Sequence, residues 1–425
     1  MDKKIGKLFK GDKVIWMVFF FLCMISIVEV FSASSELTYK SSNYVKPIIF
    51  HSGTIFFGVF VAIITMNIPC RYFKLFTPLL MAFTGIMLIS VFFIGQKVGD
   101  ANRWIDIFGL TFQPSELAKG TIVLAVAQIL SAMQRENGAD AKAFKYILWV
   151  TVPTAVLIML ENLSTAALLC LVVFLMMIIG RVPMRLLGKL AGTVTLFVAA
   201  VVAFVLIFGH VKEEEEPANL SKTEVVDKKN GEEKEEKGFF TKMFHRADTW
   251  KARFMKFGHP EVSPQEYDLD KDAQVAHANI AIVSSGIIGK GPGKSVERDF
   301  LSQAFSDFIF AIIVEELGIL GASFVVFLYI ILLYRTARIA TRCENNFPAF
   351  LAMGLSLLLV VQATFNMMVA VGFVPVTGQP LPLISKGGTS TIINCAYIGA
   401  ILSVSRTAKK KKGMEDEEQL QGARA

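Results

Sequence analysis

Cysteine, histidine and tryptophan are scarce in this chain of 425 residues, which has five, five and four of them respectively. No two cysteines form a CxxC or a similar metal-binding spacing, and the histidines are scattered along the chain. The sequence therefore indicates neither a disulfide-stapled secreted fold nor a dedicated His/Cys metal site. The cysteines lie within or beside long apolar segments, where a free cysteine behaves as a small apolar filler.

Charged residues are also sparse, at 19% of the chain against about a quarter in a typical soluble domain. Apolar residues take their place, with 53% hydrophobic residues, 36 Phe, 17 Met and a mean hydropathy of +0.53. This composition excludes a disordered protein and an ordinary cytosolic enzyme. Apolar runs of about 20 residues recur, and each is long enough to cross a hydrocarbon core about 30 Å thick, which predicts a polytopic membrane protein.

Ten apolar segments predict the fold class, an all-α polytopic membrane protein with about ten transmembrane helices. They fall near residues 14–31, 47–67, 75–95, 116–133, 146–160, 165–180, 187–208, 307–334, 347–373 and 389–404. The fifth and sixth segments are short and nearly fused, so eight or nine spans remain an alternative.

Basic residues predict the orientation of these spans. Lysines and arginines in the tail 1–13, in alternate connecting segments and in the charged tail 405–425 all fall on one side. The positive-inside rule then makes both termini cytoplasmic. Helices 1–7 occupy residues 14–208, helices 8–10 occupy 307–404, and residues 209–306 form a large extracytoplasmic loop between helices 7 and 8. The net charge of +7 is a topology signal on this interpretation, and it does not indicate a nucleic-acid partner.

The large loop has two parts of different composition. Of the 26 residues at 212–237, 16 are charged, and such an acidic insert cannot bury a core and should be disordered. Residues 238–306 carry aromatic and apolar side chains, so we expect amphipathic helices that lie on the membrane surface.

Three carboxylates stand in or at the mouth of the eighth predicted span, in the stretch SDFIFAIIVEELG at 306–318. An ionisable group at membrane depth is costly and suggests a functional site. Asp307 lies at the outer mouth, where it can meet a lipid headgroup. Glu315 lies about 12 Å deeper, and Glu316 slightly more, if the helix is continuous. These two glutamates point in other directions, and we expect them to bond neighbouring helices.

Two further segments carry polar residues at the outer membrane face. Glu116 and Lys119 form an i,i+3 pair at the start of the fourth span, and Arg103 lies just before them as an interface anchor or a phosphate clamp. Residues 374–388 are rich in proline and glycine. Irregular backbone of this kind is tolerated at membrane level only when it is buried in protein or lines a cavity.

Four ordered blocks carry a resemblance to a known family. They read NRWIDIFGLTFQPSELAK at 102–119, GIIGKGPGKS at 286–295, SDFIFAIIVEELG at 306–318 and PVTGQPLPLISKGGTS at 375–390. With the predicted spans and the large loop, these blocks resemble the SEDS family (shape, elongation, division and sporulation), and most closely its FtsW branch.

The resemblance implies a peptidoglycan glycosyltransferase of the bacterial cytoplasmic membrane. Such an enzyme polymerises lipid II into a growing glycan strand on the outer face. It implies a class B penicillin-binding protein transpeptidase and other divisome proteins as partners, with membrane lipid around the helices and the division septum as the location. It also implies that Asp307 is the catalytic residue, that Arg103 is functionally important and that Lys119 is the usual lysine of its block.

The sequence departs from the family pattern at several positions. Gln303 and Phe305 stand where relatives commonly have Glu and His, which argues against either residue type as a required second acid or base. Lys386 replaces a common Tyr and could add a phosphate contact. The turn ENLST at 161–165 lacks the aspartate of the usual motif, which puts any role for that residue in doubt.

The implied reaction needs one general base and positive charge on the leaving diphosphate. Asp307 is the candidate base. The candidate substrate and diphosphate contacts are Arg103, Lys119, Lys290, Lys294, Lys386, Glu116 and Ser385. A divalent cation, Mg²⁺ or Mn²⁺, could bridge the diphosphate, although no dedicated ligand set is visible in the sequence.

Three other functions stay open at this point. A lipid II flippase would also place charges within the membrane, but it predicts matched broken helices in two halves, which the sequence lacks. A non-catalytic scaffold of a division enzyme is a second alternative. The third is a RodA-like elongation polymerase in place of the division enzyme.

Overall fold

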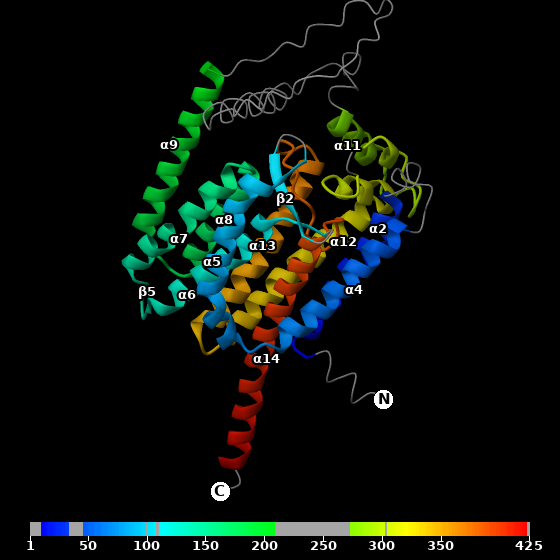
Figure 1. Ribbon diagram of the computed structural model, residues 1–425. Coiled ribbons are helices and arrows are strands. Elements are labelled where there is room, and N and C mark those ends of the chain that lie inside the picture. Colours follow the sequence, from blue (N-terminus) through cyan, green and yellow to red (C-terminus); the bar gives the residue numbers. More distant parts are fainter. Residues whose placement is uncertain are drawn as a thin grey trace, which may run out of the picture. The chain divides into compact units, whose positions relative to one another are not determined.

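The computed structural model describes residues 10–33, 46–98, 101–107, 110–208, 273–301 and 304–422, and most of them are helical (Figure 1). The chain forms two compact units, one of residues 1–188 and 268–425 and the other of residues 189–267. The helices are α2 (Lys13–Ala33), α4 (Lys46–Asn67), α5 (Cys70–Ile94), α6 (Pro114–Ala132), α7 (Ala141–Met159), α8 (Leu163–Ile179), α9 (Met184–Phe208), α11 (Ala273–Ser284), η1 (Glu297–Asp299), α12 (Ile309–Ala340), α13 (Asn346–Ala370) and α14 (Thr389–Gly422).

Several helices begin where local sequence signals place them. Pro114 occupies the first position of α6, where a proline loses no helical hydrogen bond. The Asn162 side chain accepts a hydrogen bond from the Thr165 N–H at 3.2 Å and so caps α8. Asp140 caps α7 in the same way. These caps satisfy backbone donors that have no partner inside the first helical turn.

Seven helices of the described residues are long and apolar enough to cross a membrane. They are α2, residues 48–67 of α4, α5, α6, α7, α12 and α13. α8 is apolar but shorter, at 17 residues. Helix also covers the predicted spans within α9 and α14. The chain is therefore a mainly helical membrane protein, and the count of ten spans stays a prediction.

α13 lies at the centre of the first unit, where it packs against α6, α8, α12 and α14 (Figure 1). Its buried side chains include Leu351, Leu355 and Leu358, which recur at helical spacing. By contrast, α5 exposes large apolar side chains such as Leu75 and Phe93. Polar residues of α13 and α6 are consequently enclosed by protein, whereas α5 presents a face suited to lipid.

The prediction of an all-α fold is wrong for two short segments. Strands β1 (Gln96–Val98), β2 (Ala101–Ile107) and β3 (Leu110–Phe112) form an antiparallel sheet in which Ile105 lies opposite Phe112. Strands β4 (Gln134–Arg135) and β5 (Gly138–Ala139) form a two-stranded ladder. The polar, turn-rich sequences between apolar runs pair their backbone groups as hairpins, which the helical period of the flanking spans does not reveal.

α12 differs from the predicted span 307–334 at both ends and in its interior. It begins at Ile309, so Asp307 lies before the helix. Gly318 has non-helical dihedral angles (φ 69°, ψ −172°) and breaks α12 into two pieces. The projection of Asp307 onto the same helix as Glu315 and Glu316 was therefore wrong, because Asp307 lies in the preceding turn, whereas both glutamates lie in the first helical piece, before Gly318.

Several predicted boundaries fall on parts of the chain that the structure does not describe. The acidic insert 212–237, residues 238–272 and most of the tail 1–13 lie outside the described residues. Within the remainder of the large loop, α11 is helical, as expected for that region. α14 continues past the predicted end at residue 404 to Gly422, so the charged tail extends the last helix.

Candidate active site

Asp307 lies in the turn that directly precedes α12, and its side chain is partly exposed. The Ser306 hydroxyl donates a hydrogen bond to Asp307 Oδ1 at 3.0 Å. The Ser385 hydroxyl donates to the Ser306 carbonyl at 2.6 Å, across 79 positions of sequence, and the Lys386 N–H donates to the Phe305 carbonyl at 2.9 Å. Three predicted site residues, Asp307, Ser385 and Lys386, thus come together in one place.

Lys386 brings positive charge to this turn. Its Nζ lies 4.9 Å from the centroid of the Phe305 ring, a distance at which a cation and an aromatic face attract each other. Partial burial lowers the pKa of the Lys386 ammonium group. Phe305 and Lys386 both depart from the family pattern, and they contact each other through this cation–aromatic interaction.

The segment between α13 and α14 has irregular backbone, and side chains of three helices bind its carbonyl groups. Leu381, Leu383 and Ile384 are buried, and Leu383 adopts a positive φ of 67°. The donors are Asn366 to Gln379 O (2.7 Å), Gln362 to Pro380 O (3.1 Å), Tyr329 to Pro382 O and Ser26 to Ile384 O (2.6 Å). Gln379 and residues 381–385 of this irregular segment are buried in protein, one of the two settings expected for it, and these bonds fix Ser385 and Lys386 beside the Asp307 turn.

The predicted pair of Glu116 and Lys119 is confirmed, and it is fully enclosed. Lys119 Nζ lies 2.7 Å from Glu116 Oε1 and 2.7 Å from Gln362 Oε1. The Tyr397 hydroxyl donates to the Glu116 carbonyl at 2.6 Å and accepts from the Gly120 N–H at 3.1 Å. Gln362 also donates to the Pro380 carbonyl, so it joins Lys119 to the segment 371–388.

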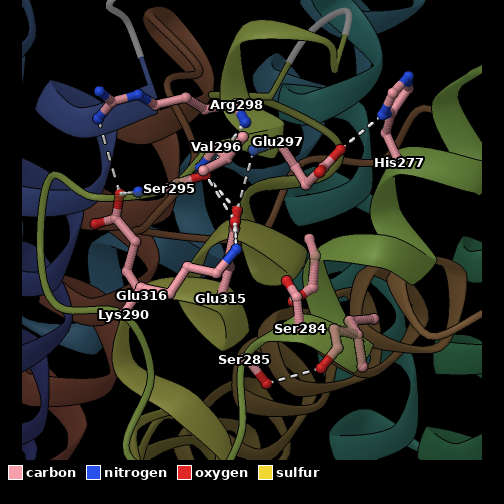
Figure 2. Close-up of polar contacts among 12 residues, drawn as sticks. His277, Ser284, Ser285, Lys290, Ser295, Val296, Glu297, Arg298, Glu315 and Glu316 are labelled. Atoms are coloured by element: carbon pink, nitrogen blue, oxygen red, sulfur yellow. Dashed lines mark hydrogen bonds and ion pairs between the residues drawn. The ribbon is translucent and has the colours of Figure 1, made fainter.

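The glycine-rich stretch 286–298 folds onto the break in α12, and Glu315 is one of its two anchors. Figure 2 shows Ser295, Val296 and Glu297 gathered over this carboxylate. Lys290 Nζ lies 2.6 Å from Glu315 Oε1, and the Val296 N–H donates to the same oxygen at 3.1 Å. The Ser295 hydroxyl donates to Glu315 Oε2. An ion pair and hydrogen bonds thus both bind this carboxylate.

Glu316 is the second anchor and binds a different part of the same stretch (Figure 2). The N–H groups of Gly293 and Ser295 donate to its two oxygens at 2.9 and 3.2 Å. The Ser32 hydroxyl from α2 also donates to it, and Arg298 Nη1 lies 3.9 Å from Oε1. The expectation that both glutamates bond neighbouring helices was wrong in the main, because their partners, apart from Ser32 of α2, belong to the stretch 286–298.

Backbone hydrogen bonds complete the contact between this stretch and the broken helix. Lys290 N–H and Gly291 N–H donate to the Glu315 and Glu316 carbonyls at 2.9 and 2.8 Å. In return, the N–H groups that follow Gly318 donate to carbonyls of residues 286 and 287. The helix can break here because the inserted stretch satisfies the orphaned backbone groups.

The remaining predicted residues take separate positions. The side chain of Lys294 is exposed, and Lys290 is paired with Glu315. The backbone of Arg103 lies in β2, but its side chain is outside the part of the chain that the structure describes, and so is Gln303. His277, from α11, lies 2.6 Å from Glu297 Oε2 and stacks on Phe300 (Figure 2 shows the His277–Glu297 contact).

Four polar residues of the site were missed from the sequence: Gln362, Asn366, Gln379 and Arg298. Gln362 and Asn366 are four residues apart in a mainly apolar helix, and this spacing puts them on one helix face. That pattern was an available signal for α13. Nothing in the local sequence marks Gln379 or Arg298, because their roles depend on long-range contacts.

The described residues contain no group of three or more His, Cys, Asp or Glu side chains placed to hold a metal ion. A cation at this site would depend on oxygens of a bound substrate for most of its coordination.

Comparison with solved structures supports the fold. A chain of a peptidoglycan synthase complex, described as coordinating polymerization and crosslinking, superposes with a TM-score of 0.68 at 23% identity, covering 94% of this chain and 98% of that one. The Thermus thermophilus rod shape determining protein RodA superposes with a TM-score of 0.61 at 21% identity, covering 93% and 97%.

Curated relatives extend the similarity over most of the sequence. Peptidoglycan glycosyltransferase MrdB of Escherichia coli K12 is 29% identical over 354 residues, covering 83% of this chain and 84% of its own. A probable peptidoglycan glycosyltransferase FtsW of Geobacter sp. strain M18 is 29% identical over 402 residues, covering 93% and 96%. Residues 12–216 and 238–410 match the FtsW/RodA/SpoVE family, described as cell cycle protein, and the chain belongs to that family.

Proposed function

We propose that this protein is a peptidoglycan glycosyltransferase that polymerises lipid II into glycan strands. The observation that carries the proposal is the similarity to relatives named peptidoglycan glycosyltransferase, which extends over 83–96% of this chain. The turn around Asp307 adds support, because it carries a partly exposed carboxylate and its main chain accepts hydrogen bonds from Ser385 and Lys386 of the segment 371–388.

In the proposed reaction, a sugar hydroxyl of one lipid-linked saccharide attacks the anomeric carbon of another. Asp307 takes the hydroxyl proton as the new C–O bond forms, and a positioned general base typically contributes about 10²–10⁴-fold. The bond from the anomeric carbon to the diphosphate breaks, and the polyprenyl diphosphate leaves with the electron pair. The anomeric carbon is inverted.

The leaving diphosphate needs cations close to the Asp307 turn. Lys386 is the described cation whose backbone is bonded to that turn, so it is the main candidate together with Arg103. Lys294 is exposed and remains a candidate contact. Lys119 and Lys290 are each paired with a glutamate, so we assign them to holding the site in shape. We derive no step through a metal ion.

The membrane topology follows from the charge pattern. We propose ten spans with both termini in the cytoplasm, so that Asp307 faces the outer side of the bacterial cytoplasmic membrane. A class B penicillin-binding protein is the proposed transpeptidase partner, because the similar chain in the solved synthase complex belongs to an assembly for polymerization and crosslinking.

A division role, and hence a septal location, is favoured by coverage. The relatives named FtsW cover 93–96% of this chain, whereas MrdB covers 83%, although the identities are alike. Fluorescent fusions in the native cell test this choice, since septal signal supports division and sidewall signal supports elongation.

Polymerase and flippase assays on one preparation test the function itself. Purified full-length protein with its partner is reconstituted in liposomes with lipid II. Glycan strands longer than the substrate disaccharide are expected, and the Asp307→Asn variant should express normally and make none. Transfer of lipid II between leaflets without glycan products would support the flippase instead, and undiminished polymerisation by Asp307→Asn would remove the base assignment.

A further inference from the structure

Asn366 connects the two segments that form the candidate site. Its side chain lies on α13 and is only 1% exposed. The Nδ2 amide donates one hydrogen bond to the Asp307 carbonyl at 2.8 Å and another to the Gln379 carbonyl at 2.7 Å. Both N–H groups of one planar nitrogen are thereby used, and each reaches a different segment of the chain.

This arrangement fixes the distance between the turn and the segment that faces it. Asp307 lies before α12, and Gln379 lies six positions before Ser385 in the segment 371–388. Neither carbonyl belongs to a helix or strand that would hold it by itself. Asn366 stands on a rigid helix and binds both, so its amide adds to the bonds from Ser385 and Lys386 in setting their separation.

The amide is retained although it carries a cost. Asn366 Oδ1 is buried and has no hydrogen-bond partner among the described residues. An unpaired buried acceptor destabilises a protein, and an apolar side chain of similar shape would avoid this loss. The two donated bonds are therefore the feature that distinguishes asparagine from leucine at this position.

Gln362, one helical turn away, makes a parallel connection. Its Nε2 donates to the Pro380 carbonyl at 3.1 Å, and its Oε1 accepts from Lys119 at 2.7 Å. The segment 371–388 is thus bonded at neighbouring carbonyls by two amides from one face of α13. Of these two amides, that of Asn366 extends the connection to the residue that carries the candidate base.

We propose that Asn366 is a positioning residue, which holds the main chain of Asp307 in register with the segment that carries Ser385 and Lys386. The inference rests on the proposed glycosyltransferase function. Loss of both N–H donors leaves the direct bonds from Ser385 and Lys386 to the turn, but it removes the bond to the Asp307 carbonyl itself, so that Asp307 can shift relative to the segment. A displacement on the order of 1 Å can lower the rate of an enzyme by about 10²-fold.

The test compares Asn366→Ala with Ser356→Ala in the full-length protein. Ser356 lies on α13 and is also fully buried, and its hydroxyl has no hydrogen-bond partner among the described residues. The measurements are kcat and KM for lipid II polymerisation, binding of fluorescent lipid II, and the thermal midpoint. We expect Asn366→Ala to lose about 10²-fold in kcat, with KM, lipid II binding and midpoint close to those of Ser356→Ala.

A second variant, Asn366→Ser, keeps the test decisive if Asn366→Ala folds poorly. Asn366→Ser keeps one donor in a smaller side chain and should fall between Asn366→Ala and the wild type in kcat. A wild-type kcat in Asn366→Ala would overturn the positioning role. Parallel losses of kcat, lipid II binding and thermal midpoint in both Asn366→Ala and Asn366→Ser would also overturn it. If Asp307→Asn is inactive while Asn366→Ala is fully active, this inference alone fails. Activity in Asp307→Asn would count against the proposed function instead.

Discussion

Replacement of Gly318 by alanine should detach the stretch 286–291 from the break in α12. Gly318 has a positive φ of 69°, and a Cβ atom there would lie 2.3 Å from the Ile287 carbonyl oxygen and 2.5 Å from the Gly289 nitrogen. Ordinary contact begins at 3.4 Å, so the facing backbone must move by about 1 Å. Both obstructing atoms are main chain, which leaves no flexible side chain to yield.

The magnitude follows from the bonds that such a movement breaks. Four backbone hydrogen bonds join the stretch to the helix, with lengths of 2.8, 2.9, 3.2 and 3.3 Å. At about 1 kcal/mol net for each bond, their loss destabilises the closed contact by about 4 kcal/mol. Since every 1.4 kcal/mol corresponds to a factor of ten, amide hydrogen exchange should accelerate by about 10³-fold.

Hydrogen exchange measured by mass spectrometry detects the loss of these bonds at the backbone N–H groups that donate them. Peptides covering Lys290, Gly291 and Ile319 should exchange faster in Gly318→Ala. Gly293→Ala is the matched control for backbone strain, because Gly293 has φ 79° but nothing lies within 4 Å of the position that a Cβ atom would take there. Gly85→Ala, in the open middle of α5, should leave exchange in this region unchanged. Equal exchange in Gly318→Ala and Gly293→Ala would refute the steric reasoning.

Two further substitutions probe the buried framework. Lys119→Met leaves the Glu116 carboxylate buried without its cation, and loss of one partner of a buried pair costs about 3–5 kcal/mol. We therefore expect little folded protein on size-exclusion chromatography. The double variant Glu116→Gln/Lys119→Met should recover the folded protein. Well-folded Lys119→Met would contradict this account. Asn162→Ala removes the cap of α8 and should lower the free energy of unfolding by about 1 kcal/mol, seen as a reduced thermal midpoint, whereas an unchanged midpoint would show that the cap contributes nothing.

Much of the fold could be predicted because single-helix signals are local. Apolar length predicted the seven helices that are long and apolar enough to cross a membrane, and the start of α6 was marked by Pro114 in the sequence itself. The pair of Glu116 and Lys119 was predictable for the same reason, since residues three apart on a helix always adjoin. The hairpin β1–β3 was missed because its strands are short and lie between two strong helical patterns.

The site was only partly predictable because its contacts are long-range. Ser385 and Asp307 were each predicted as site residues, but nothing in the local sequence shows that the Ser385 hydroxyl binds the turn that contains Asp307. Glu315 and Glu316 were assigned to helix contacts because the break at Gly318 could not be anticipated from a glycine within an apolar run. Asn366 had a detectable signal as a polar residue in an apolar helix, yet its two partners appear only in the folded chain.

The most direct test of the central claim is the product made from lipid II by the purified full-length protein with the proposed transpeptidase partner. Gel or mass-spectrometric separation of fluorescent products should reveal a ladder of disaccharide repeats for the wild type and none for Asp307→Asn at equal expression. A wild-type preparation that binds lipid II but forms no glycan strand would contradict the account, and so would an equal ladder from the Asp307→Asn variant.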